Sequence, residues 1–254
     1  MTQSPTTGDI YIGAVAFAIQ FYCDFSGYSD MARGLASMMG FKLSLNFNLP
    51  YSATNPAVFW QKWHITLSSW LRDYCYAPLL KAKWINGNKS QALLLTMAIA
   101  GFWHGAEWRF VLWGTLWGVL ILIYRLLIAM ITRYKRKGRY INNMIGILGT
   151  ILTVNLWMLI GQFFVTRQVS DGINNIVILF TDWSISAYTI TYMMTILYYV
   201  WPLILIQIAQ QYTKNLYVVL SWPYYLRLSV YTVLLLLLMT SGAEGGAEFI
   251  YFQF

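Results

Sequence analysis

The sequence predicts an all-α fold, a polytopic bundle of transmembrane helices in which some helices are broken or re-entrant. Hydrophobic residues make up 58% of the 254 residues and charged residues only 10%. The mean hydropathy is +0.53, more apolar than a soluble domain can bury. Several apolar runs exceed the roughly 20 residues that a helix needs to cross a membrane. The chain lacks the alternating pattern of a transmembrane barrel, so helices are expected to satisfy the backbone in the bilayer.

Positive charge is concentrated in one connection between apolar runs. The formal net charge is +8. The basic cluster comprises Arg125, Arg133, Lys135, Arg136, Lys137 and Arg139. By the positive-inside rule, this cluster predicts that residues 132–140 form a cytoplasmic loop, and it argues against nucleic acid as a partner. The two cysteines, Cys23 and Cys75, are too few for a disulfide framework.

Residues 1–254 are expected to form a single membrane domain, which opens with an apolar segment at residues 1–42. This segment is either one span or a pair of short spans broken near Gly27. Asp30 and Arg33 lie three positions apart, so they can pair on one helix face. Such a pair lowers the free-energy cost of placing each charge in the membrane. The pair either fixes helix packing or lines a polar cavity.

Residues 43–89 are predicted to form a re-entrant or interfacial segment. Residues 42–56 carry Asn, Ser and Pro, which is typical of a connection rather than a span. In residues 59–74, apolar and polar positions mix at helical spacing. One side of this predicted helix carries Trp60, Trp63, Leu67, Trp70 and Leu71. Such a helix suits the membrane interface or the interior of the bundle.

The rest of the chain alternates between spans and charged connections. Residues 90–131 are expected to hold the helices that flank His104, the first of them short for a full crossing. Residues 141–254 contain the C-terminal spans, expected at 141–165, 188–208 and 224–240. The basic loop is expected on the same side as Lys81, Lys83, Lys89, Lys214 and Arg227. The opposite side is expected to carry Asp9, Asp171, Asp182, Glu244 and Glu248, a segregation that supports this orientation.

The chain has two histidines, and both lie in tryptophan-rich segments that break the spanning pattern. His64 follows Trp63, and His104 follows Trp103. A histidine in an apolar wall often serves packing alone, but two in such segments indicate a shared site. A neutral imidazole can take a proton from a hydroxyl group near neutral pH, so His104 is a candidate general base.

Four stretches spread over nearly the whole chain resemble one protein family. They are Tyr22–Ala32 (YCDFSGYSDMA), Phe59–Tyr74 (FWQKWHITLSSWLRDY), Gly101–Ala106 (GFWHGA) and Phe249–Phe254 (FIYFQF). They are similar to the membrane-bound O-acyltransferase family, and within it to the bacterial alginate O-acetyltransferase-like branch. Members of that branch are longer and have further spans before the first stretch, so the resemblance covers the C-terminal half of the family fold.

The resemblance implies a multi-pass enzyme of the bacterial cytoplasmic membrane. This enzyme would transfer an acyl group, which is expected to be acetyl, to a hydroxyl of an alginate-like envelope polysaccharide. In the family the near-invariant histidine matches His104, and a second functional histidine matches His64. Family members form a helix bundle with a tunnel through its thinned centre. No bound cofactor or metal is expected, and the acyl donor is acetyl-CoA or an acyl carrier thioester on the cytoplasmic side. The other expected partners are the lipid bilayer, the polysaccharide, and a partner acetyltransferase or a missing N-terminal half.

The substrate-binding candidates flank the two histidines in sequence. Trp103 and Trp60 would line and dry the passage, although bulky aromatic residues at helical spacing also serve plain packing. Ser68 or Asp73 could help His64 to orient the acyl carrier or to stabilise developing charge.

Three other readings stay open. Acidic residues and the histidines could line a transport pathway for a sugar or a proton. His104 and Glu107, three positions apart, could hold a metal with His64. An inactive fragment could act in export or as a scaffold.

Overall fold

The computed structural model describes residues 4–131 and 139–241, in which the regular structure is helical and no strand occurs. The α-helices are α1 (Thr7–Met38), α2 (Pro56–Lys62), α3 (Ile65–Leu71), α4 (Ala77–Lys81), α5 (Lys89–His104), α6 (Trp108–Ile131), α7 (Arg139–Val165), α8 (Val169–Thr181), α9 (Ala187–Thr213) and α10 (Tyr224–Ser241). Short segments η1 (Pro50–Ser52), η2 (Arg72–Tyr76) and η3 (Val218–Ser221) lie between them, and η2 is a π-helix. The predicted all-α fold is confirmed.

Four of these helices are long and apolar enough to cross a membrane. They are α1, α9, residues Trp108–Ala129 of α6 and residues Met144–Val165 of α7. The chain is therefore a multi-pass membrane protein. The segment expected to cross at residues 224–240 is apolar but shorter than these four, as is α8. Helix α5 has 16 residues, fewer than the roughly 20 needed for a full crossing, as expected.

Helix α1 is one continuous helix rather than two short ones. A capping box between Thr6 and Asp9 starts it, and it continues through Gly27 to Met38. The predicted pair is present, with Arg33 Nη1 at 3.0 Å from Asp30 Oδ1. Arg33 also donates to the Tyr217 hydroxyl, and the pair lines a cavity of about 440 Å³. The pair therefore links α1 to the segment after α9 and lines a cavity as well.

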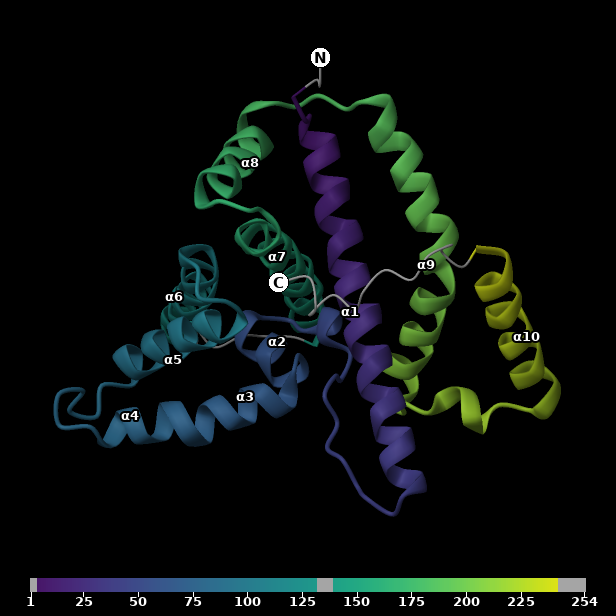
Figure 1. Cartoon of the computed structure of the whole chain (residues 1–254), viewed down its shortest axis with the longest axis horizontal. Coiled ribbons are helices and arrows are strands. Elements are labelled where there is room, and N and C mark those ends of the chain that lie inside the picture. Colours follow the sequence, from purple (N-terminus) through teal and green to yellow (C-terminus); the bar gives the residue numbers. More distant parts are fainter. Residues whose placement is uncertain (1–3, 132–138, 242–254) are drawn as a thin grey trace.

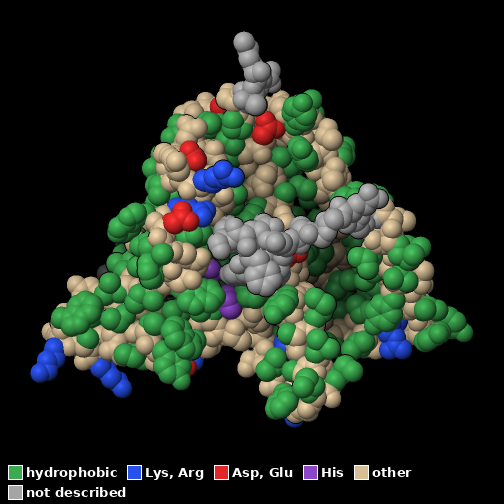
Figure 2. Space-filling view, in the orientation of Figure 1, with side chains coloured by type: hydrophobic (Ala, Val, Ile, Leu, Met, Phe, Trp, Pro, Cys, Tyr) green, Lys and Arg blue, Asp and Glu red, His purple; other side chains and the backbone are tan. Residues whose placement is uncertain are grey.

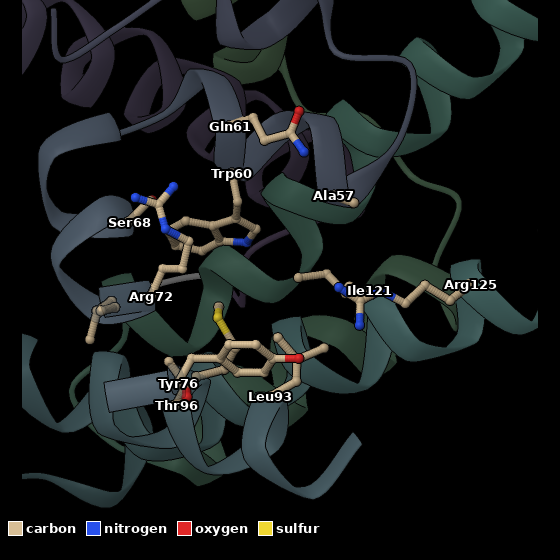
Figure 3. A pocket seen from close by; sticks show the side chains of 12 residues that line it. Ala57, Trp60, Gln61, Ser68, Arg72, Tyr76, Leu93, Thr96, Ile121 and Arg125 are labelled. Carbon is tan, nitrogen blue, oxygen red and sulfur yellow. The ribbon is translucent and has the colours of Figure 1, made fainter. Parts of the chain in front are cut away.

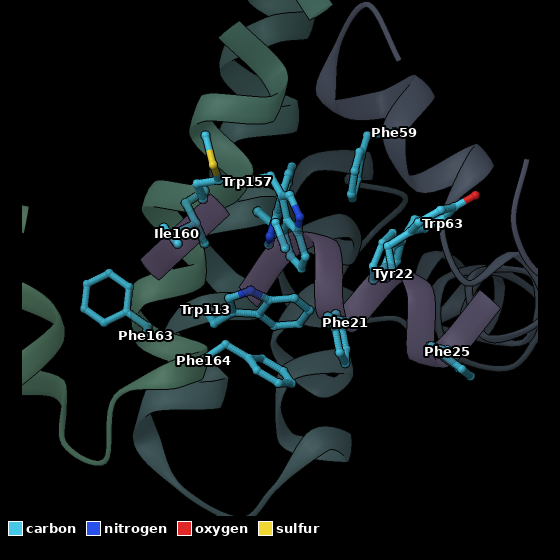
Figure 4. Packing of buried hydrophobic residues seen from close by; sticks show 14 of the residues in the cluster. Phe21, Tyr22, Phe25, Phe59, Trp63, Trp113, Trp157, Ile160, Phe163 and Phe164 are labelled. Atoms are coloured by element: carbon cyan, nitrogen blue, oxygen red, sulfur yellow. The ribbon is translucent and has the colours of Figure 1, made fainter. Parts of the chain in front are cut away.

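The core is an aromatic cluster where α1, α6 and α7 meet the segment after α1 (Figures 1 and 4). Phe21 near the middle of α1 contacts Trp63 and Trp157, with ring centroids 5.4 and 6.3 Å apart. Helices α5 and α6 approach closely because glycines face the partner backbone. A Cβ at Gly101 would overlap the Phe110 carbonyl oxygen, and one at Gly114 would overlap the carbonyl oxygen of Met97. Small residues at such contacts allow the close helix packing typical of membrane proteins.

Residues 43–89 do not form a span but a chain of short helices that lies along one end of the bundle (Figure 1). The predicted connection at residues 42–56 is irregular apart from η1 and the start of α2. The helix expected over residues 59–74 is interrupted, because Trp63 is extended and His64 has a left-handed backbone with φ 42°. The interruption splits the expected apolar stripe. Trp63, Leu67 and Leu71 are buried, whereas Trp70 is exposed.

Helices α9 and α10 lie on the other side of α1 (Figure 1). Most of their apolar side chains are exposed. The first turn of α9 is tied to α1, since Asp9 accepts hydrogen bonds from Ser186 and Thr189 at 2.5 and 2.7 Å. Thr7 N–H donates to Asp182 at 3.1 Å and joins the start of α1 to the end of α8. Helix α9 continues through Pro202.

Charged side chains are unevenly distributed over the molecule. On the face drawn in Figure 2, acidic side chains lie mostly toward the upper end, where some basic side chains lie beside them, and further basic side chains lie at the lower margins. Residues 132–138, which form most of the predicted basic loop, and residues 242–254 with the FIYFQF stretch lie outside the described residues.

Candidate active site

His104 is the last residue of α5, and its ring lies against aromatic side chains from two other helices. The centroids of Trp113 on α6 and Phe164 on α7 lie 5.1 and 5.2 Å from that of His104. The helix ends here because Gly105 is extended, and a Cβ at that position would overlap the Phe110 ring. His104 is partly exposed as a residue, whereas its Nδ1 atom is buried.

His64 lies at the break between α2 and α3, and its side chain is 9% exposed. Its ring stands edge-on to Phe25, with centroids 4.6 Å apart. Its Nδ1 lies 3.1 Å from Asn46 Oδ1. Because Phe25 is near the middle of α1, the ring lies at mid-length of that spanning helix.

The structure brings the two histidines together around one indole. The Trp103 ring centroid is 6.0 Å from that of His64 and 4.9 Å from that of His104. Trp103 is 52% exposed, and histidine side chains reach the molecular surface near the centre of the face in Figure 2. The predicted shared location is therefore present, at a partly open point of the aromatic core.

Trp60 and Ser68 line a separate cavity of about 280 Å³ between the α2–η2 segment and helices α5 and α6 (Figure 3). The lining is mainly apolar, with Arg72 and Arg125 contributing guanidinium groups. Trp60 Nε1 is buried and has no acceptor among the described residues. The Trp60 ring packs on Trp113, at 5.8 Å, and Trp113 in turn contacts His104. A single tryptophan therefore separates this cavity wall from His104.

Asp73 lies apart from both the cavity lining and the histidines. Its carboxylate accepts a hydrogen bond from Arg72 Nε at 2.8 Å and is half-exposed. The Arg72 guanidinium lowers the pKa of Asp73 from its usual value. Of the four substrate-binding candidates, the structure places Trp103 with the histidines, Trp60 and Ser68 in the cavity, and Asp73 at the surface.

Glu107 does not share a helix face with His104, because α5 ends at His104. Its carboxylate pairs with Arg109 at 2.9 Å, and the Arg109 guanidinium lowers the pKa of Glu107 from its usual value. Arg109 also donates to the carbonyl oxygens of Phe164 and Thr166 at the end of α7. The described residues contain no group of three or more His, Cys, Asp and Glu that could hold a metal ion.

Sequence reasoning missed Asn46, Trp113 and Phe164 as neighbours of the histidines. Asn46 lies in the stretch interpreted as a connection, and the other two lie inside spans as ordinary aromatic residues. An asparagine that is buried rather than exposed in a connection is a signal, but burial is visible only in the tertiary structure.

Comparison with known proteins identifies the family. The model of MBOAT, the membrane-bound O-acyltransferase family, matches residues 11–166, a range that includes both histidines. The chain belongs to this family.

The names of relatives within the membrane-bound O-acyltransferase family refer to different polymers. A probable alginate O-acetylase of Azotobacter vinelandii is 49% identical over 49% of this chain and 25% of its own length. A peptidoglycan O-acetyltransferase of Helicobacter pylori is 36% identical over 64% of this chain and 30% of its own length. A teichoic acid D-alanyltransferase of Bacillus subtilis is 31% identical over 47% of this chain and 32% of its own length. The chain thus matches less than a third of each of these relatives.

Proposed function

We propose that this chain carries the acceptor-activating part of a membrane O-acyltransferase that acetylates hydroxyl groups of an alginate-like envelope polysaccharide. The observation that carries the proposal is the meeting of His64 and His104 around Trp103 at a partly open point of the core. The names of the relatives support the acceptor class, because alginate, peptidoglycan and teichoic acid are all hydroxyl-bearing polymers. The greater identity to the alginate O-acetylase favours acetyl over D-alanyl as the group transferred.

The proposed reaction begins with proton transfer to His104. Its imidazole accepts the proton of the acceptor hydroxyl as that oxygen attacks the carbonyl carbon of an acyl thioester. The carbon–sulfur bond then breaks, and the departing thiolate takes the proton from the His104 imidazolium. His64 helps to orient the acceptor oxygen, and the Trp103 ring contributes an apolar wall that limits competing water.

The cavity lined by Trp60 and Ser68 is the proposed place for the acyl donor. Its apolar walls suit the flexible arm of acetyl-CoA or of an acyl carrier thioester. Arg72 and Arg125 can bind donor phosphate groups. Asp73 would then act by holding Arg72 rather than by touching the substrate.

The proposed location is the bacterial cytoplasmic membrane, with the donor cavity toward the cytoplasm. The side of the molecule with Lys81, Lys83 and Lys89 would face the cytoplasm by the positive-inside rule. The donor would approach from that side and the polysaccharide from the opposite one. A partner acetyltransferase, or further spans of the family fold, would complete the enclosure.

The test is transfer of labelled acetyl groups to the polysaccharide by membranes that contain the full chain. We expect His104→Gln to lower the rate by roughly 100-fold or more, since general base catalysis typically contributes that much. Ile99→Ala is the matched control, because Ile99 lies on the same helix and is exposed. Transfer retained by His104→Gln, with equal protein in the membrane, would remove His104 from the mechanism.

A second candidate function is export of the polymer or an acyl group, or scaffolding, by a chain without transferase activity. The polar cavity lined by Asp30 and Arg33 favours it, because such a cavity can accept sugar hydroxyls. It would move polymer across the membrane without new ester bonds, so the labelled acetyl assay also separates the two functions.

A further inference from the structure

Asn46 forms an unusually complete set of contacts for a residue in a connection. It is 8% exposed. Its side-chain oxygen lies 3.1 Å from His64 Nδ1 and accepts hydrogen bonds from the Thr66 hydroxyl at 2.9 Å and from Thr66 N–H at 3.4 Å. Its side-chain nitrogen donates to the Ser29 hydroxyl on α1 at 3.0 Å. Its main-chain carbonyl accepts from Ile65 N–H at 2.9 Å.

These contacts fix which atom of the Asn46 amide faces His64. The backbone N–H of Thr66 can only donate, so the amide atom that faces it must be the oxygen. That oxygen can only accept, so a hydrogen bond between it and His64 Nδ1 requires a hydrogen on Nδ1. The Thr66 hydroxyl lies 3.4 Å from the same Nδ1, but its closer partner is the Asn46 oxygen at 2.9 Å. In the neutral imidazole the other ring nitrogen, Nε2, is then left with a lone pair.

The backbone holds this arrangement in place on both sides of the helix break. Asn48 N–H donates to the carbonyl of Lys62 at 2.9 Å, just before the break, and the Asn46 carbonyl receives Ile65 N–H just after it. The left-handed conformation of His64 is uncommon for a residue other than glycine, and such conformations persist where surrounding contacts determine them. The Asn46 segment supplies these contacts.

We propose that Asn46 is a positioning residue that holds His64 in its Nδ1–H tautomer, so that Nε2 accepts a hydrogen bond from a neighbouring hydroxyl of the acceptor sugar while the reacting hydroxyl donates its single hydrogen to His104. This role rests on the proposed acyltransferase function. His64 then orients the sugar through the neighbouring hydroxyl, and His104 removes the proton of the reacting hydroxyl. With the opposite tautomer, His64 would present an N–H to the neighbouring hydroxyl instead of an acceptor, and the sugar would be misoriented.

The first experiment measures the tautomer without depending on activity. The full chain is labelled with ¹⁵N-histidine and placed in lipid nanodiscs, and ¹⁵N–¹H correlation spectra report which ring nitrogen carries the hydrogen. Because the chain has two histidines, His104→Gln leaves the signals of His64 alone. We expect His64 to be the Nδ1–H tautomer, and an Nε2–H tautomer in the otherwise unaltered site would overturn the proposal.

The second experiment changes Asn46 and measures both tautomer and kinetics. Asn46→Leu removes the acceptor, and we expect the Nδ1–H form to lose its dominance and kcat for acetyl transfer to fall by about tenfold or more, with KM for the donor little changed. Asn46→Asp keeps an acceptor oxygen, so it should retain the Nδ1–H tautomer and recover much of kcat. An Asn46→Leu protein with an unchanged tautomer or unchanged kcat would contradict the proposal.

The matched control is Asn48→Leu in the same segment. The Asn48 side chain is exposed and makes no hydrogen bond to the described part of the chain. This change should leave the His64 tautomer and kcat as they are. If no form of the chain transfers acetyl groups, the proposed function fails, whereas the tautomer spectra still decide whether Asn46 sets the state of His64.

Discussion

The helices around the two histidines and the pair α9–α10 are similar in apolarity but differ in packing. Residues 108–129 of α6 and helix α9 both qualify as spans by hydropathy. Trp113 and Trp117 of α6 are almost fully buried, whereas Pro202 is the one buried residue of α9. Apolarity therefore places a helix in the bilayer, but it does not decide whether the helix joins the core.

Glycine provides a physical reason for this difference. Helix α6 contains Gly114 and Gly118, which lie against α5, whereas the sequences of α9 and α10 contain no glycine. In a membrane the lipid tails are as apolar as the side chains, so close packing rather than hydrophobic burial drives helix association. The histidines are located in the region where that close packing occurs.

The largest expected effect comes from a substitution at the most buried tryptophan of α6. Trp117 is 0% exposed, and its ring stacks on Phe59 at 5.3 Å. We expect Trp117→Ala to cost about 3–5 kcal/mol, because it leaves a cavity among rings that cannot close around it. Thermal unfolding in detergent provides the measurement. Trp201→Ala on α9 is the control, since Trp201 is 43% exposed and lipid can fill the space, and equal losses would show that both regions pack alike.

A smaller effect tests the glycine contact between α5 and α6. Gly114→Ala would place a Cβ against the Met97 carbonyl, so we expect a loss of about 1–3 kcal/mol, typical of overpacking. Gly13→Ala on α1 meets no atom within 4 Å and should instead be neutral or slightly stabilising, because alanine favours helix more than glycine does. Unfolding temperatures of the two variants should therefore move in opposite directions, and a stabilising Gly114→Ala would rule out the close contact.

The smallest expected effect comes from weakening the contact between α9 and α1, away from the histidines. Asp9→Ala removes the hydrogen bonds from Ser186 and Thr189 that tie the first turn of α9 to α1, and also the capping box with Thr6 at the start of α1. We expect faster amide hydrogen exchange in that turn, and acetyl transfer equal to that of the unaltered chain. Asp171→Ala, at an exposed acid on α8, should leave exchange in α9 unchanged. A fall in transfer with Asp9→Ala would mean that α9 contributes to the site.

The sequence predicted those features that depend on residues close along the chain. The spans at α1, α6, α7 and α9 follow from runs of apolar residues. The Asp30–Arg33 pair follows from their spacing on one helix face. Comparison of motifs predicted the family, because the four stretches keep their order along the chain. The family model that matches residues 11–166 confirms this prediction.

The tertiary structure decided what depends on distant contacts. A continuous stripe over residues 59–74 predicted one helix, but paired backbone hydrogen bonds with residues 46–48 divide it at His64. The same contacts bring Asn46 to the His64 ring. The packing of α5 on α6 and α7 places the His104 ring next to that of Trp103. Local periodicity records which face of a helix is apolar, whereas the meeting of residues 46, 64 and 104 depends on how separate elements pack, which no local pattern encodes.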